Sequence, residues 1–314
     1  MTLLFVCFFL FLVCGMPIAF VIGIASLAFF IGTGEPLTII VNRIVAQSQS
    51  FTFLAVPFFI FAGNLMNVSG ITDRLLSLAR IVTRGLHGGT AQISVVMSTL
   101  MGGVSGSATA DAAMETRILG PEMMRVGYKK GYICAVNCCT ALITATIPPS
   151  LGLIIFGFVG QVSIGRLFAA GIIPGVLMMV FLMATVSLTA RHYRYEPPKK
   201  DVAARSARQF AKELIVNLAD SIWALLFPVI LIVGIRFGIF TPSESGAFAV
   251  VYAIIVGKFI YRELTWAKFL DALKTSFKDN GAIMLIIALS GPFSYAITLV
   301  KLPIVLSNFI FGIT

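Results

Sequence analysis

The chain has 314 residues, of which 58% are hydrophobic and only 11% are charged. A water-soluble fold of this length lacks the interior to bury so much apolar surface, so the composition excludes an ordinary soluble domain and indicates lipid as the solvent. Because hydrocarbon cannot hydrogen-bond free backbone groups, the long apolar runs predict membrane-spanning helices. The predicted fold class is an all-α polytopic membrane protein.

The formal net charge of +10 comes from cations that lie mainly in short connectors between the apolar runs. This placement is typical of signals that orient membrane helices, and it gives no basis for nucleic-acid binding. All five cysteines lie in apolar segments, so neither a disulfide framework nor a thiolate metal site is expected.

Apolar runs divide the chain into candidate membrane segments. In chain order they cover residues 2–32, 51–68, 91–114, 131–157, 167–190, 218–239, 244–260, 281–300 and 303–314. Between residues 71 and 84, apolar and charged residues alternate at helical spacing, which predicts an amphipathic helix at the membrane interface. Thr241-Pro242-Ser243-Glu244 predicts the start of a helix that is capped by Thr241 or Ser243.

The apolar run 91–114 is expected to enter and leave the membrane on the same side. Lys and Arg are concentrated in 191–213, which the positive-inside rule places in the cytoplasm, and counting spans backward places the basic stretch 117–130 there too. The basic segment 73–84 is separated from that stretch by this one run, so both flanks fall on one face. Clustered glycines and serines at 102–107 would break the helix inside the bilayer. The charges therefore predict a re-entrant hairpin.

The tip of this hairpin carries the strongest chemical signal. Ser107, Asp111 and Glu115 follow at four-residue steps and share one helix face. A carboxylate in the membrane is costly unless it is paired or hydrated, which makes Asp111 a candidate functional group. The hydroxyls of Ser105 and Ser107 and the carbonyls freed near Gly106 are oxygen donors that suit sodium, and the helix N-terminus favours an anion. Alternatively, the serines are caps and packing residues, and Asp111 joins two helices by a hydrogen bond.

A second break is expected within the fourth apolar run. Pro148 and Pro149 free backbone carbonyls on the preceding turn, and Asn137, Thr140 and Thr144 form a polar stripe that leads to them. The alternative is a proline kink whose Thr hydroxyls bond their own helix. Two broken elements with their own hydroxyls predict that the breaks meet at one site.

Weak internal similarity suggests a duplicated architecture. Pro17 matches Pro242 and Gly32 matches Gly257 at one offset, and Pro57-Phe58 matches Pro292-Phe293 at a slightly larger one. Inverted repeats of this kind are common in transporters, although chance matches among apolar runs are the alternative. The partner of the hairpin would fall beyond Thr314, so the second repeat is expected to be incomplete in this sequence.

Three motifs, in the order GGVSGSATAD at 102–111, IPPS at 147–150 and GIFTPSE at 238–244, carry a family resemblance over essentially the whole chain. The chain resembles the large membrane subunit of TRAP transporters, the tripartite ATP-independent periplasmic systems. The resemblance implies an elevator-type sodium (Na+) symporter in a bacterial inner membrane. It implies import of a small carboxylate, such as a sialic acid or a C4-dicarboxylate, delivered by a periplasmic substrate-binding protein beside a small four-helix membrane subunit.

The resemblance also implies functional residues and domains. The sodium site would contain Ser105, Gly106, Ser107, Thr144, Pro148 and Pro149, and the substrate would contact Ser107, Asp111, Thr146 and Ser150. The domains would be scaffold helices with an amphipathic arm at 1–90, a transport domain at 91–157, scaffold helices with a cytoplasmic loop 191–217 at 158–280, and the start of a second repeat at 281–314. The family's second hairpin and second Pro-Pro break are absent from this sequence.

Two other functions compete with this interpretation. A single-component sodium:dicarboxylate symporter would use the same kind of hairpin. An intramembrane serine protease would match Gly103-Val104-Ser105-Gly106, but it needs a base such as His on another span. His87 and His192 lie in polar connectors, so the chain is not expected to be an enzyme.

Overall fold

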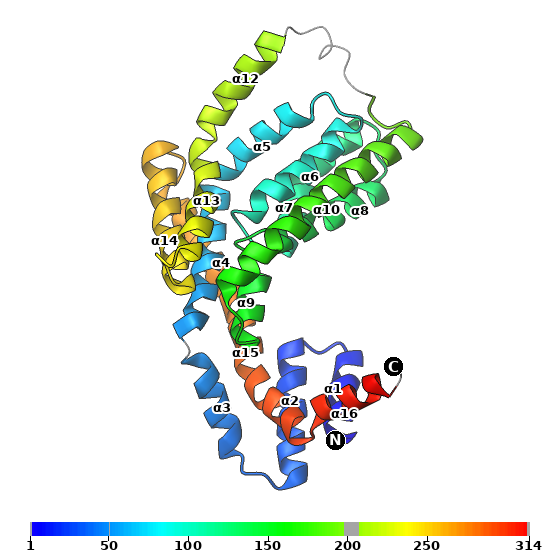
Figure 1. Ribbon diagram of the computed structural model, residues 1–314, viewed down its shortest axis with the longest axis vertical. Helices are drawn as coiled ribbons and strands as arrows, with labels where there is room; N and C mark the ends of the chain where they lie inside the picture. The colour runs from blue at the N-terminus through cyan, green and yellow to red at the C-terminus, as the bar shows by residue number, and fades with distance from the viewer. Residues whose placement is uncertain (1, 50, 198–206, 313–314) are drawn as a thin grey trace. The chain divides into compact units, whose positions relative to one another are not determined.

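The structure is a computed structural model that describes residues 2–49, 51–197 and 207–312. In this part of the chain the regular elements are all helices, as the apolar runs predict (Figure 1). The chain divides into two compact units, one formed by Met1–Phe53 with Phe277–Thr314 and the other by Leu54–Ser276. The fold class is therefore an all-α polytopic membrane protein, whereas the division into scaffold and transport domains remains a prediction.

Helices of membrane-spanning length occur together with bent helix pairs. Among the described residues, α10 (Ile164–His192), α14 with the π-helical turn η2 (Pro242–Ile260) and α15 (Trp266–Leu299) are long and apolar enough to cross a membrane. Three bent pairs raise the number of candidate spans to six: α4 (Ala55–Val68) with α5 (Ile71–Thr83), α8 (Lys130–Thr146) with α9 (Leu151–Val159), and α12 (Ala207–Asp220) with α13 (Ile222–Arg236).

The smaller unit contains α1 (Thr2–Val13), α2 (Ile18–Thr33), α3 (Thr38–Ser48), the second part of α15 and α16 (Leu302–Phe311). Its core is aromatic, with Phe29, Phe30 and Ala296 buried. The predicted run 2–32 is in fact two helices, because Gly15 adopts φ +75° and Pro17 caps α2.

Two features of the structure differ from the sequence pattern. No apolar run covers α3, because its residues are mixed in polarity and none is buried. The polar stretch before the run 281–300 is not a connector throughout, because α15 is one helix from Trp266 to Leu299. Residues 266–280 contain no proline, and their charged side chains are compatible with helix.

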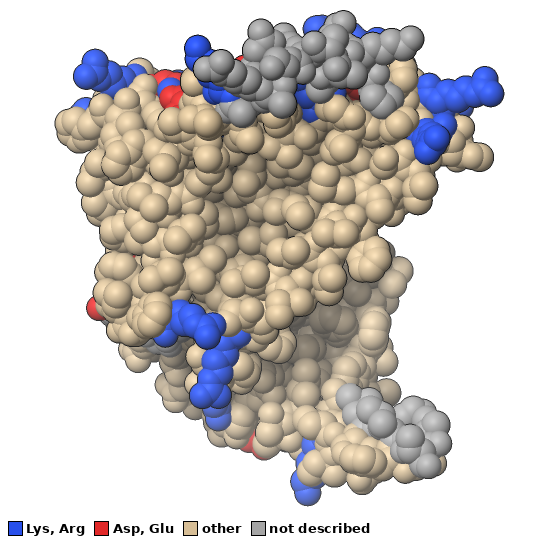
Figure 2. All heavy atoms as spheres, turned by 45° about the horizontal axis from the view of Figure 1, so that its top comes forward, with Lys and Arg blue, Asp and Glu red and all other residues tan. Residues whose placement is uncertain are grey.

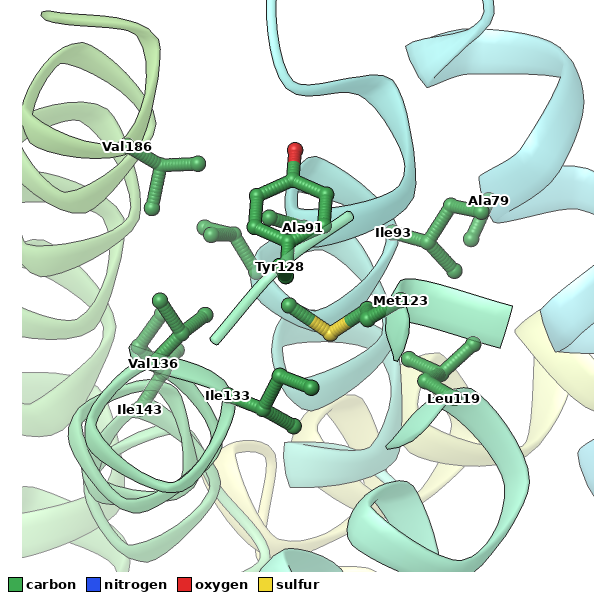
Figure 3. Close-up of a cluster of buried hydrophobic side chains, with 11 residues drawn as sticks. Ala79, Ala91, Ile93, Leu119, Met123, Tyr128, Ile133, Val136, Ile143 and Val186 are labelled. Atoms are coloured by element: carbon green, nitrogen blue, oxygen red, sulfur yellow. The ribbon is translucent and has the colours of Figure 1, made fainter. Parts of the chain in front are cut away.

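The larger unit is built around the predicted hairpin, formed by α6 (Gly89–Gly102) and α7 (Ala108–Arg125). Its arms pack with α5, α8 and α10 on an apolar core (Figure 3). The core residues are Ala79, Ala91, Ile93, Val95, Leu119, Met123, Tyr128, Ile133, Val136, Ile143 and Val186. The amphipathic helix is confirmed as α5, but its apolar residues Ile71, Leu75 and Leu78 are buried, so this face packs on protein.

Both ends of the hairpin lie at the same end of the larger unit, which confirms the predicted antiparallel arrangement. Arg80 of α5 forms a 2.8 Å ion pair with Glu122 near the end of α7. Glu196, which follows α10, accepts hydrogen bonds from Thr90 N (2.8 Å) at the start of α6 and from the Tyr128 hydroxyl (3.5 Å) after α7. Figure 2 shows charged side chains, most of them Lys and Arg, along the upper edge of the view, and below this edge lies a broad surface of uncharged residues.

The predicted cytoplasmic loop 191–217 is helical at both ends. Helix α10 continues to His192, and α12 begins at Ala207. The basic residues Lys199, Lys200 and Arg205 lie outside the described residues.

Candidate functional site

The hairpin tip, residues 103–107, lies directly against the break between α8 and α9. Leu151 N donates a 3.3 Å hydrogen bond to the Gly106 carbonyl. Gly106 has φ +60°, and a Cβ added there would lie 2.5 Å from the Pro149 carbonyl oxygen. Only glycine fits this approach, so the structure brings together the two breaks that the sequence predicts.

The break itself is held by a cap and by close packing on α10. Ser150 is the N-cap of α9, and its hydroxyl also donates a 2.6 Å hydrogen bond to the Ala145 carbonyl. A Cβ on Gly171 would lie 2.5 Å from the Thr146 carbonyl, and one on Gly175 would lie 2.4 Å from Ile147. Helix α10 thus approaches the break through two glycines one turn apart.

Two further helices enclose the tip. A Cβ on Gly63 of α4 would lie 3.2 Å from the Ser105 carbonyl, and one on Gly103 would lie 2.6 Å from Pro228 of α13. Ser105 is buried as a result, and its hydroxyl has no hydrogen-bond partner in the described part of the chain. A buried hydroxyl without a partner is unusual and marks this position as a candidate ligand site.

Below the tip, the two carboxylates of α7 are each only 1% exposed. Asp111 Oδ2 accepts a 2.5 Å hydrogen bond from Thr144 of α8, whereas Asp111 Oδ1 has no partner among the described residues. Glu115 accepts hydrogen bonds from Ser98 (2.7 Å) and Thr140 (3.2 Å), and also from Ser94. These hydroxyls tie both hairpin arms to α8.

Ser94 and Ser98 of α6 belong to this cluster, although the sequence pattern did not single them out. They are four residues apart and therefore lie on one face of α6. This four-residue spacing of two serines, in the hairpin arm that was predicted to face the acidic arm, is the sequence feature that could have identified them. No described Lys or Arg forms an ion pair with Asp111 or Glu115, so hydroxyl groups are their neighbours.

The other predicted site residues make hydrogen bonds within or at the ends of their own helices. Ser107 is the N-cap of α7 and accepts a hydrogen bond from Ala110 N at 3.5 Å. The Thr146 hydroxyl donates to the Leu142 carbonyl of its own helix at 2.8 Å. Ser107 and Ser150 therefore cap helices and Thr146 bonds its own turn, while the assignment of these residues to ion or substrate binding stays a prediction.

The contacts around Ser105 give no support to a protease. Its hydroxyl contacts no described base, and His192 lies at the last residue of α10, where its ring meets Tyr193 at 5.0 Å between centroids. A serine nucleophile needs a base within hydrogen-bond reach.

Comparisons with known proteins agree on one family. Residues 5–314 match the model described as the tripartite ATP-independent periplasmic transporter, DctM component. The chain is 35% identical to the protein YgiK of Salmonella typhimurium, with 99% of the chain and 70% of YgiK aligned.

Two relatives have names that state a substrate. The chain is 34% identical to the 2,3-diketo-L-gulonate TRAP transporter large permease protein YiaN of Escherichia coli, covering 94% of the chain and 68% of that protein. It is 32% identical to the sialic acid TRAP transporter large permease protein SiaM of Vibrio cholerae, covering 96% and 69%. These are transporters and not enzymes. The chain belongs to the family of large membrane subunits of TRAP transporters.

Proposed function

We propose that this chain is the translocation subunit of a sodium-coupled TRAP transporter that imports a small organic acid across a bacterial inner membrane. Its partners would be a small four-helix membrane subunit and a periplasmic substrate-binding protein, in keeping with the tripartite family. The observation that carries the proposal is the contact between the hairpin tip and the second helix break, together with two buried oxygens that have no hydrogen-bond partner among the described residues.

The chemistry of these oxygens suits a sodium ion. Ser105 Oγ and Asp111 Oδ1 are oxygen donors without hydrogen-bond partners among the described residues. The tip and the Pro148-Pro149 break add backbone carbonyls at the same place, and unwound carbonyls in transporters coordinate such ions. The described residues contain no cluster of His, Cys, Asp and Glu suited to a transition metal, so an oxygen-ligated ion is the better fit.

An anionic substrate would be attracted to the same region by two helix ends. The N-termini of α7 and α9 open at the tip and at the break, and they are capped by Ser107 and Ser150. The partial positive charge of each N-terminus favours a carboxylate. Ser107 and Thr146 are partly exposed, which leaves their side chains accessible to a solute. The substrate names of the relatives suggest an acid of the sialic acid or diketogulonate class.

Movement of the hairpin would carry this site across the membrane by an elevator mechanism. The hairpin arms share one apolar core with α5, α8 and α10, so these helices would move as one body. Sodium would order the tip first and thereby complete the substrate site.

Uptake by the complete transporter in proteoliposomes tests the proposal. Ser105→Ala and Asp111→Asn should each raise the sodium concentration for half-maximal uptake at least about tenfold, because each removes a proposed ion ligand. Ser77→Ala, on the exposed side of α5, is the control. Unchanged sodium dependence in both variants would count against the site, and uptake without any binding protein would favour a single-component symporter.

A further inference from the structure

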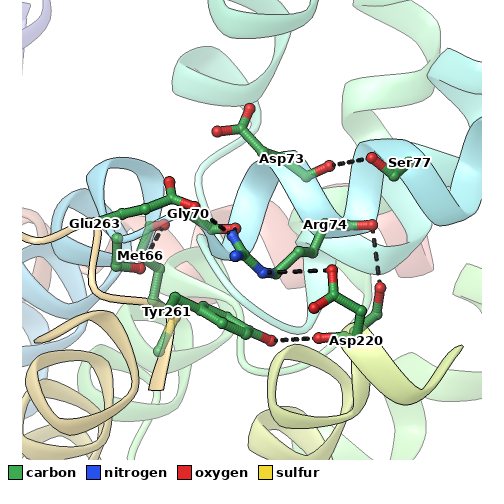
Figure 4. Close-up of polar contacts among 10 residues, drawn as sticks. Met66, Gly70, Asp73, Arg74, Ser77, Asp220, Tyr261 and Glu263 are labelled. Carbon is green, nitrogen blue, oxygen red and sulfur yellow. Dashed lines mark hydrogen bonds and ion pairs between the residues drawn. The ribbon is translucent and has the colours of Figure 1, made fainter. Parts of the chain in front are cut away.

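Two bent helix pairs of the larger unit have their elbows side by side. Helices α4 and α5 meet at 66° next to Gly70, and α12 and α13 meet at 60° next to Ser221. The Ser221 hydroxyl donates a 3.1 Å hydrogen bond to the carbonyl of Arg74 in the first turn of α5. The elbows therefore contact each other at the start of α5 (Figure 4).

The guanidinium of Arg74 contacts the turn before its own helix and two other segments of the chain, one with Asp220 and one with Tyr261 and Glu263. Its Nη1 donates to Glu263 Oε1 at 2.6 Å and to the Gly70 carbonyl at 2.9 Å. The group lies 3.7 Å from the ring centroid of Tyr261, and its Nε is 3.6 Å from Asp220 Oδ2. The Arg74 side chain is only 19% exposed and Glu263 is 35% exposed, so their charged hydrogen bond is stronger than a solvated surface pair. The contact with Asp220 is weaker, because that side chain is 63% exposed.

Gly70 makes room for this arrangement. It has φ +82°, and a Cβ there would lie 2.4 Å from Glu263 Oε2 and 2.7 Å from Arg74 Nη1. A side chain at this position would push the ion pair apart. The sharp turn between α4 and α5 and the ion pair thus depend on the same glycine.

Tyr261 connects the second elbow to the same group. Its hydroxyl donates a 3.0 Å hydrogen bond to the carbonyl of Asp220, the last residue of α12. The last carbonyls of a helix cannot all be paired within the helix, and here a side chain from another segment donates to one of them. Tyr261 itself is held under the Arg74 guanidinium.

These contacts lie between the apolar helices α4, α13 and α14 and the hairpin. Helix α5 packs along α6, and Ala79 of α5 belongs to the core cluster with Ile93 and Leu119 of the hairpin arms. Helix α12 packs on α5. A change in the angle at either elbow would therefore displace the hairpin.

We propose that Gly70, Arg74, Asp220, Tyr261 and Glu263, together called the elbow node, fix the two elbows relative to each other. Helices α5 and α12 then swing as a single lever when the hairpin moves. Arg74 is a positioning residue in this scheme, because it touches neither the ion nor the substrate. The proposal rests on the proposed function only in assuming that the hairpin moves during transport.

The test combines a distance measurement with uptake. Spin labels on Ser77→Cys and Val216→Cys, both exposed, report the separation of α5 and α12 once the five native cysteines are replaced by alanine. We expect one narrow distance distribution in the parent, with and without sodium, and a broadened one in Arg74→Gln. Uptake by the complete transporter should fall roughly threefold to thirtyfold in Arg74→Gln, as expected for loss of a mechanical coupling. The sodium concentration for half-maximal uptake should stay the same.

Arg80→Gln is the matched control, because Arg80 lies on the same helix in an ion pair whose side chains are 47% and 36% exposed. It should change neither readout. Tyr261→Phe removes only one hydroxyl and should broaden the distribution less, which keeps the test usable if Arg74→Gln folds poorly. Three results in Arg74→Gln would each contradict the elbow node. These are a distance distribution that is not broadened, a broadened distribution with normal uptake, and a change in the sodium concentration for half-maximal uptake. Sodium-independent uptake in the parent would instead count against the proposed function. The distance measurement would still test whether the elbow node fixes the two elbows relative to each other.

Discussion

The hydroxyl of Thr144 in α8 donates a 2.5 Å hydrogen bond to Asp111 in α7, and it also lies 2.9 Å from the Ser98 carbonyl of α6. One side chain from the broken helix thus contacts both arms of the hairpin. The site is therefore formed by two broken elements, and a substitution of Thr144 in α8 should alter the position of the hairpin residues that it contacts.

Replacing Thr144 by Val removes the short hydrogen bond from its hydroxyl to Asp111 Oδ2. We expect the sodium concentration for half-maximal uptake to rise about tenfold, since a hydrogen bond to a charged group contributes about 1.5–3 kcal/mol. Thr185→Val in α10, where the hydroxyl bonds only the Phe181 carbonyl of its own helix, is the control. Equal sodium dependence in the two variants would show that Thr144 does not position Asp111.

Glu115 should matter more for stability than an exposed carboxylate does. Glu115→Ala would remove the 2.7 Å acceptor of the buried Ser98 hydroxyl, and an unsatisfied buried group costs about 1–3 kcal/mol. The Ser94 hydroxyl would keep Asn137 Oδ1 at 3.1 Å as its acceptor. Thermal unfolding of the purified protein should therefore shift to clearly lower temperature. Glu122→Ala, which removes only the surface ion pair with Arg80, should cost less than about 1 kcal/mol. The idea fails if the two variants unfold at the same temperature.

Alanine substitutions at Gly106 and Gly127 distinguish the effect of backbone strain from the effect of losing the contact at the hairpin tip. Both have positive φ, +60° and +94°, but a Cβ on Gly106 meets the Pro149 carbonyl at 2.5 Å while one on Gly127 meets nothing within 4 Å. Gly127→Ala should cost about 1 kcal/mol in stability and keep uptake. Gly106→Ala should abolish uptake, because the tip can no longer lie against the break. Normal uptake by Gly106→Ala would show that the contact is dispensable.

Tyr128, which lies between α7 and α8, should make the protein sensitive to alkaline pH. Burial raises the pKa of its hydroxyl, and the charge of Glu196 raises that pKa further. The folded protein then retains this proton where the unfolded chain loses it, so stability should fall as the pH rises above the ordinary tyrosine value near 10. Tyr128→Phe should remove this part of the alkaline loss, which unfolding measured at several pH values would detect. If the stability of the parent and that of Tyr128→Phe fall equally as the pH rises, Tyr128 is not the cause of the alkaline sensitivity.

Local sequence determined the apolar helices, the breaks within them and several of their caps. The predicted cap at Thr241 is confirmed, since Thr241 and Glu244 form a capping box at the start of α14. Glycines at the hairpin tip and Pro148-Pro149 in the fourth apolar run break helices wherever they stand, because the cause is in the backbone of those residues. The antiparallel hairpin also followed from the sequence, because basic residues flank it on both sides.

Only the tertiary structure decided which of these features meet. Nothing in the local sequence shows that Ser94 and Ser98 of α6 donate hydrogen bonds to Glu115 of α7. Arg74 likewise pairs with Glu263, which lies 189 positions away in the chain. The helical state of residues 266–280 was also undecided by polarity, since charged residues are compatible with both helix and loop. Periodicity and backbone chemistry act over a few residues, whereas partners distant in the chain are selected by packing of the whole unit.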